Sequence, residues 1–130
     1  MNVLDENISI VQHNRLKGRR IPVRHIGYDV GRKGMKDDEV TPFLRSLSRP
    51  TFFTLDWDYY RRNLCHARYC LVYLDVKRDE AATFIRHLLR HPDFNTQAKR
   101  IGKVIRVSQA GLAVWRLHAE QEALIDWPKR

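Results

Sequence analysis

The chain has 130 residues, of which 43% are hydrophobic, which suits one folded domain with a single core and excludes an intrinsically disordered chain. It carries 24 Lys and Arg against 15 Asp and Glu, for a net charge of +9. A basic balance of this size favours a polyanionic partner, nucleic acid above all, although an acidic protein partner fits the same charge.

No apolar run approaches the roughly 18–20 residues of a membrane span, and the first residues lack the basic and apolar regions of a secretory signal. The two cysteines, Cys65 and Cys70, are too few for a disulfide scaffold and fit a reducing compartment. We therefore expect a cytoplasmic protein without a membrane segment.

The first half of the chain alternates short apolar runs with helical patterns. Expected in order are a strand over 2–4, a helix from Ser9 to Lys17 with Val11 and Leu16 on its apolar side, a strand over 21–27 and a loop over 27–34. A second helix begins near Asp37, which is a plausible N-cap. Its apolar face combines Val40, Phe43, Leu44 and Leu47.

The second half begins with the apolar, β-prone run 51–55, which predicts a buried strand. After it we expect a strand over 71–76, a helix over 79–90 capped by Asp79, a hairpin of 102–108 with 112–117, and a short helical piece near 120–124. Strands that alternate with helices indicate a mostly parallel sheet covered on both faces. The predicted fold is a single-domain three-layer α/β/α sandwich with a C-terminal antiparallel hairpin.

Seven of the 15 acidic residues lie in three short groups. Asp5 and Glu6 follow the first strand, Asp37 to Glu39 open a helix, and Asp56 and Asp58 follow the buried strand. The C-terminal ends of parallel strands share one edge of a sheet, so these carboxylates are expected to meet there. Each alone is more simply a cap or a solvated loop residue, but together they favour a Mg²⁺ site, since Mg²⁺ takes carboxylates, waters and phosphate oxygens.

Three segments resemble, in chain order, the motifs of compact PIN-like domains, which are relatives of the ribonuclease toxins of toxin–antitoxin pairs. They are Val3–Asn7, Gly34–Val40 and Thr54–Tyr59, and they cover roughly the first half of the chain. The second half matches in architecture only. The resemblance implies a PIN-like sandwich, Mg²⁺- or Mn²⁺-dependent cleavage of RNA, and a small antitoxin protein as partner. A homodimer is left open.

Carried over by position, the resemblance implies that the catalytic metal ligands are Asp5, Asp37, Asp56 and Asp58, with Glu39 as a further candidate ligand. Asn7 is expected to hydrogen-bond the acidic cluster. Tyr59 and Lys36 stand where the family commonly has Phe and Ser or Thr, and neither substitution removes a carboxylate.

Phosphate contacts are expected from basic residues, namely Arg19, Arg20, Arg24, Arg32, Lys33, Arg61, Arg62 and Arg68. Trp57 is a candidate for stacking on a base, although such side chains more often pack against protein. Two further functions remain open. One is a non-catalytic nucleic-acid or protein-binding module with the same fold, and the other is a nuclease that acts on DNA or on particular nucleic-acid structures.

Overall fold

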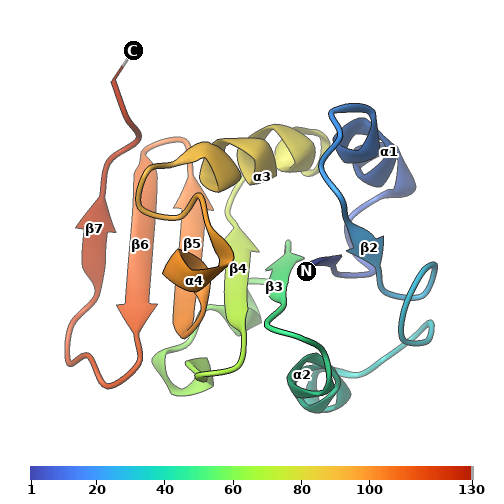
Figure 1. Cartoon of the computed structure of the whole chain (residues 1–130), viewed down its shortest axis with the longest axis horizontal. Coiled ribbons are helices and arrows are strands. Elements are labelled where there is room, and N and C mark those ends of the chain that lie inside the picture. Colours follow the sequence, from blue (N-terminus) through green and yellow to red (C-terminus); the bar gives the residue numbers. More distant parts are fainter. Residues whose placement is uncertain (130) are drawn as a thin grey trace.

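Seven strands form one sheet in the order β2-β1-β3-β4-β5-β6-β7 in the computed structural model, which describes residues 1–129 (Figure 1). The strands are β1 (Asn2–Leu4), β2 (Arg24–His25), β3 (Thr51–Thr54), β4 (Cys70–Leu74), β5 (Lys103–Ser108), β6 (Gly111–Arg116) and β7 (Ala123–Ile125). Neighbours from β2 through β5 pair in parallel, whereas β5–β6 and β6–β7 pair antiparallel. The predicted, mostly parallel sheet with a C-terminal hairpin is confirmed.

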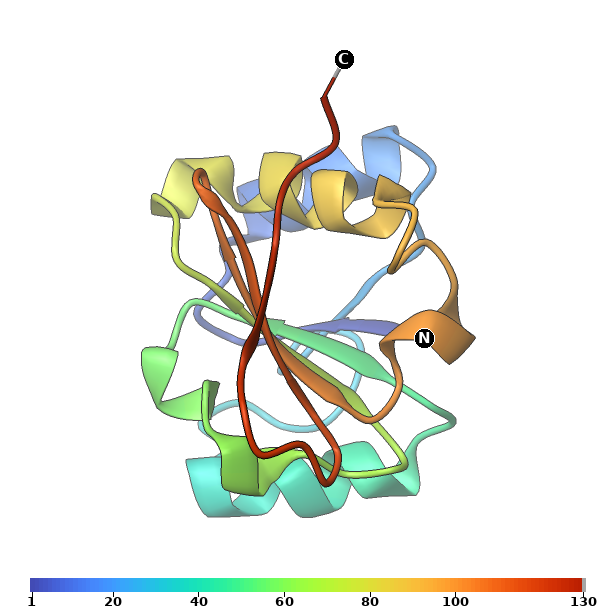
Figure 2. The same cartoon turned by 90° about the vertical axis from the view of Figure 1, so that its left-hand side faces the viewer.

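Helices cover both faces of this sheet. On one face lie α1 (Ile10–Gly18) and α3 (Ala81–Arg90), and on the other lies α2 (Asp37–Ser46) (Figure 2). The shorter elements are α4 (Gln97–Arg100) and the 3₁₀ turns η1 (Trp57–Tyr59), η2 (Arg62–Leu64) and η3 (Arg78–Glu80). No helix within residues 1–129 is long and apolar enough to cross a lipid bilayer.

The interior strand β3 shows why the sheet needs a layer of helices on each face. All four of its residues are buried. Phe52 packs into the core on the α2 side, and Phe53 packs into the core on the side of α1 and α3, because successive side chains of a strand point to opposite faces. The predicted buried strand is confirmed, and its C-terminal end delivers the following residues to the edge of the sheet.

The first helix differs from the prediction in its buried face. Ser9 caps α1 by accepting a hydrogen bond from the Gln12 N–H, and Leu16 is buried as expected, but Val11 is 54% exposed. Gln12 is buried instead, because its side-chain oxygen accepts the Ala82 N–H at the start of α3 at 2.9 Å. A polar pairing between two helices therefore replaces the expected apolar contact.

Three expected boundaries also change. The second strand is limited to Arg24–His25, since Pro22 has no N–H for a ladder. The N-cap of α2 is Lys36, and Asp37 is the first helical residue. Asp79 lies inside the turn η3 and does not cap α3. Asp37 nevertheless stays at the start of its helix, as the sequence predicts.

The expected helical piece near 120–124 is wrong. Residues Ala123–Ile125 form β7, which pairs with β6. Ala123 and Ile125 pack against the core while Leu124 is 79% exposed, so the segment follows the two-residue period of a strand. The edge of β6 that faces away from β5 offers backbone N–H and C=O groups to this segment. Pairing of this kind cannot be recognised from the local sequence pattern.

Candidate metal centre

Asp56 and Asp58 lie in the loop that leaves β3. The Asp56 carboxylate accepts the Asp58 N–H at 2.9 Å, which makes Asp56 the cap of the turn η1. Asp56 is half-buried against the end of the sheet, and Asp58 is exposed. The turn therefore holds two carboxylates close together at the C-terminal edge of the parallel strands, as the sequence predicts.

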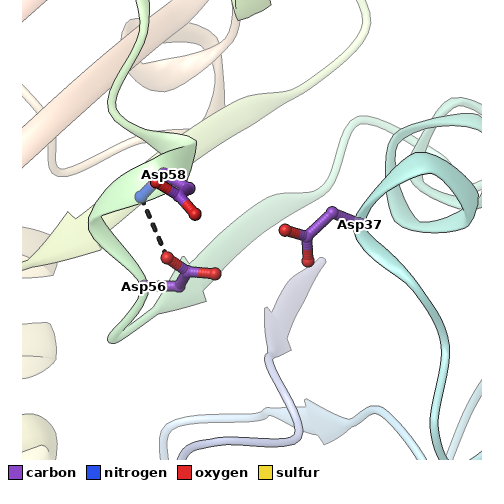
Figure 3. A group of neighbouring side chains, drawn as sticks. All are labelled: Asp37, Asp56 and Asp58. Atoms are coloured by element: carbon purple, nitrogen blue, oxygen red, sulfur yellow. Dashed lines mark hydrogen bonds between the residues drawn. The ribbon is translucent and has the colours of Figure 1, made fainter.

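Asp37 joins this pair from the start of α2. Tyr59 is buried just beyond Asp58, and its hydroxyl donates a hydrogen bond of 3.0 Å to Asp37. One carboxylate oxygen from each of Asp37, Asp56 and Asp58 lies within 4.8 Å of the others (Figure 3). We call these three residues the carboxylate triad.

Asp5 follows β1 and is linked to the triad through Thr54. The Thr54 hydroxyl donates to the Asp5 carboxylate at 2.6 Å and accepts the Asp56 N–H at 3.0 Å. Asn7 donates to the same hydroxyl at 3.2 Å, and its side-chain oxygen accepts the Leu55 N–H. Asn7 thus supports the loop through Thr54, while Asp5 lies next to the triad and outside its 4.8 Å group.

Burial raises the pKa of the Asp5 carboxyl, and the nearby charges of Asp37 and Asp56 raise it further. Hydrogen bonds from Thr54 and from the Glu6 N–H act in the opposite direction. Because Asp37 and Asp56 both repel the charged form of Asp5, the carboxylates of these three segments interact electrostatically. A bound cation would relieve this repulsion.

The donor set suits a hard divalent cation. Carboxylate oxygens are the ligands that Mg²⁺ and Mn²⁺ prefer. Within residues 1–129, Arg61 lies 3.7 Å from Asp58, and neither Asp37 nor Asp56 makes an ion pair within 4.0 Å. The triad can therefore hold a metal ion, and its ligands do not distinguish Mg²⁺ from Mn²⁺.

Two of the remaining acids of the predicted groups, Glu39 and Glu6, have other contacts. Glu39 pairs with Arg32 and accepts the Lys36 N–H at 3.2 Å. Glu6 accepts the Gly34 N–H with both oxygens, at 2.8 and 2.9 Å. These bonds fasten the loop before α2, and Glu39 lies outside the triad's 4.8 Å group.

The predicted basic residues divide between several parts of the surface. Arg19 and Arg20 follow α1, Arg24 lies in the edge strand β2, and Arg32 and Lys33 belong to the loop before α2. Arg68 is exposed just before β4.

Arg61 contacts the triad directly through its ion pair with Asp58. It also lines, with Arg62, a groove of about 610 Å³ that Arg116 and His118 complete. Sequence reasoning missed Arg116 and His118, because only the pairing of β6 with β5 brings the end of β6 beside the loop after β3.

No role was assigned from the sequence to two further residues at this edge. Thr54 reads as a strand residue, yet its hydroxyl connects Asp5 to the Asp56 backbone. Asp75 directly follows β4, is exposed, and accepts a hydrogen bond of 3.4 Å from the Tyr73 hydroxyl. Its position just past a strand was the signal that could have identified it, as it did for Asp5.

Comparisons of the chain with protein-family models, with curated proteins and with solved structures return no match.

Proposed function

We propose that this protein is a metal-dependent endoribonuclease that hydrolyses RNA phosphodiester bonds. The observation that carries the proposal is the carboxylate triad, in which oxygens of Asp37, Asp56 and Asp58 lie within 4.8 Å of one another on a chain of net charge +9. An acidic focus within a basic protein suits a divalent cation and a polyanionic substrate together.

In this proposal the triad holds Mg²⁺ or Mn²⁺, and Asp5 adds negative charge beside it. When bound, such an ion activates water and stabilises the charge that develops on a phosphate during hydrolysis. The chain's own contribution is to fix the ligands. Tyr59 orients Asp37, the Asp58 N–H orients Asp56, and Thr54 ties Asp5 to the same loop.

In this proposal, the groove beside the triad provides the phosphate contacts that bind the RNA backbone. Arg61, Arg62, Arg116 and His118 line it, and guanidinium groups bind phosphates in a bidentate manner. Trp57 is 67% exposed between Asp56 and Asp58, where an indole ring can stack on an unpaired base. These two features favour a single-stranded substrate.

The direct test is cleavage of a single-stranded RNA with Mg²⁺ or Mn²⁺, with and without EDTA, beside Asp37→Asn and Asp56→Asn. We expect cleavage to need the metal and to fall at least about 10²-fold in both variants, the order of loss when a stabilising group is removed. Asp93→Asn is the matched control, because Asp93 is an exposed acid in the loop between α3 and α4. Equal cleavage by all variants would mean that a contaminant cuts the RNA.

Two other results identify the alternatives. Cleavage of a single-stranded DNA of the same sequence at a higher rate would assign the site to DNA. RNA binding without any heat of Mn²⁺ binding at millimolar metal in calorimetry would identify a non-catalytic binding module that keeps the fold.

The proposed biological role is that of a toxin whose activity a small antitoxin protein blocks. It depends on the proposed ribonuclease activity and on the resemblance of the three motifs to PIN-like toxins. Induced expression should then arrest growth of a bacterial host, and Asp56→Asn should abolish the arrest. Equal arrest by both forms would contradict this role.

A further inference from the structure

A second pocket lies on the face of the sheet that α3 covers, whereas Asp37 of the triad belongs to α2 on the other face. Its volume is about 420 Å³, within the usual range for small-molecule sites. Its walls include Phe84, His87 and Arg90 of α3, Gln109 of the β5–β6 turn, and Trp127 after β7. We call it the aromatic pocket.

Hydrogen bonds hold the wall that comes from the C-terminal segment. The Trp127 indole N–H donates to the Ser108 carbonyl at 2.7 Å, and His91 Nε2 donates to the Asp126 carbonyl at 3.0 Å. Figure 2 shows this segment passing beside α3 after it leaves β7. One bond therefore holds the ring of Trp127 at its N–H and the other holds the backbone just before it, so contacts within the chain itself position this wall of the pocket.

Rings dominate the lining of the pocket. Trp127 lies 6.1 Å from Phe84 and 5.9 Å from His87 between ring centroids, and Phe84 lies 5.4 Å from His87. All three pairs are tilted or edge-to-face, which leaves ring surface available to a ligand. A flat apolar group fits such walls best. The Gln109 side-chain nitrogen donates to Glu80 at 3.3 Å, and its carbonyl oxygen can accept a hydrogen bond from the edge of the ligand.

Charge at the rim is positive. Arg90 is exposed, and no carboxylate within residues 1–129 lines the pocket. One helical turn earlier, Arg86 lines a neighbouring hollow of about 460 Å³ with Arg15 of α1 and Arg19, which follows α1. Arg86 and Arg90 lie four residues apart on α3, so their side chains are neighbours on one face of the helix and can act together on one anion.

We propose that the aromatic pocket binds a nucleobase, and that Arg90 and Arg86 bind the phosphate attached to it. The ligand class is a nucleotide, either free or within an RNA strand. This site is separate from the carboxylate triad and does not depend on the proposed nuclease activity, since binding here requires neither a metal nor cleavage.

The test follows the indole N–H signals of the full chain by ¹⁵N-edited NMR in EDTA, with the Trp127 signal assigned from its loss in Trp127→Phe. Adenosine 5′-monophosphate should shift the Trp127 signal to saturation. Adenosine without phosphate should bind about tenfold more weakly, the order expected for loss of a charge-assisted hydrogen bond. Arg90→Gln should abolish this preference, whereas Arg45→Gln, an exposed arginine of α2, should keep it.

A six-nucleotide RNA then distinguishes between a free nucleotide and a nucleotide within an RNA strand as the ligand. Tighter binding of the RNA than of the mononucleotide, with the same Trp127 shift, supports a nucleotide within a strand, and equal or weaker binding supports a free nucleotide. The proposal is overturned if neither probe shifts the Trp127 signal at about 10 mM, a concentration at which a ligand with a Kd of about 1 mM would occupy most of the sites. It is also overturned if Arg90→Gln leaves both affinities unchanged.

Discussion

The Tyr59 hydroxyl donates a hydrogen bond of 3.0 Å to the carboxylate of Asp37, across 22 residues of sequence. It joins the loop after β3 to the first residue of α2, and these two segments carry all three members of the carboxylate triad. Tyr59 is itself held by the core, since its ring meets Phe52 edge-to-face at 5.3 Å. A buried aromatic residue thus sets the position of an exposed metal-ligand candidate.

Tyr59→Phe should weaken metal binding while leaving the fold intact. The ring keeps its contact with Phe52, but Asp37 loses the donor that orients it. We expect Mn²⁺ affinity to fall about 10-fold or more, the usual cost of losing an outer-shell partner. Calorimetric titration measures it. Tyr73→Phe is the control, because its hydroxyl contacts Asp75 and no triad member. Unchanged affinity in Tyr59→Phe would show that Asp37 needs no such support.

Asp5→Asn should stabilise the metal-free protein at neutral pH. Burial raises the pKa of this carboxyl above its ordinary value of 3.8, so the charged form is disfavoured in the folded state. The folded protein is destabilised to the full extent above the raised pKa, where the Asp5 carboxyl is charged in both the folded and the unfolded state. This destabilisation vanishes at pH values below 3.8, where the carboxyl is protonated in both the folded and the unfolded state.

Thermal unfolding in EDTA as a function of pH tests whether removal of the Asp5 charge stabilises the protein. The melting temperature of Asp5→Asn should exceed that of the wild type at pH 7, and the two should converge as the pH falls toward 3.8. Asp93→Asn, which changes an exposed acid, should show no such convergence. A lower melting temperature for Asp5→Asn at pH 7 would mean that the Thr54 hydrogen bond outweighs the burial of charge.

Trp57→Ala should reduce RNA binding without reducing stability. The side chain is 67% exposed, so its removal should change the free energy of unfolding by less than about 0.5 kcal/mol. Loss of one stacked base should weaken binding of a single-stranded RNA about tenfold. Fluorescence anisotropy with a labelled RNA in EDTA measures this, and Trp57→Phe should retain most of the affinity. Equal binding by Trp57→Ala would exclude base stacking at this position.

Gln12→Ala should destabilise the fold. The Gln12 side-chain oxygen accepts the buried Ala82 N–H at 2.9 Å, and its removal leaves that donor unsatisfied at a cost of about 1–3 kcal/mol. Urea unfolding gives the value. Val11→Ala is the neighbouring control, since Val11 is 54% exposed and its truncation should cost less than about 0.5 kcal/mol. Similar losses in the two variants would contradict the assigned burial.

Local patterns in the sequence were enough for most of the fold. The β3 and β4 strands, the helix α3 and the β5–β6 hairpin follow from apolar runs, helical spacing and turn residues, which act over a few neighbours. The strand ends also placed Asp5, Asp56 and Asp58 at one edge, because parallel strands share a direction. Sequence alone therefore determined the architecture and the edge at which carboxylates meet.

Only the tertiary structure decided which groups contact each other there. It brought Asp37, Asp56 and Asp58 within 4.8 Å of one another but left Asp5 and Glu39 outside this group, since Asp5 accepts from the Thr54 hydroxyl and Glu39 pairs with Arg32. These outcomes depend on side-chain reach between segments that are distant in the chain. The same holds for β7, which forms on the open edge of β6, and for Trp127, which meets α3 only after that pairing. Such contacts arise from packing and backbone pairing at long range, which no local period encodes.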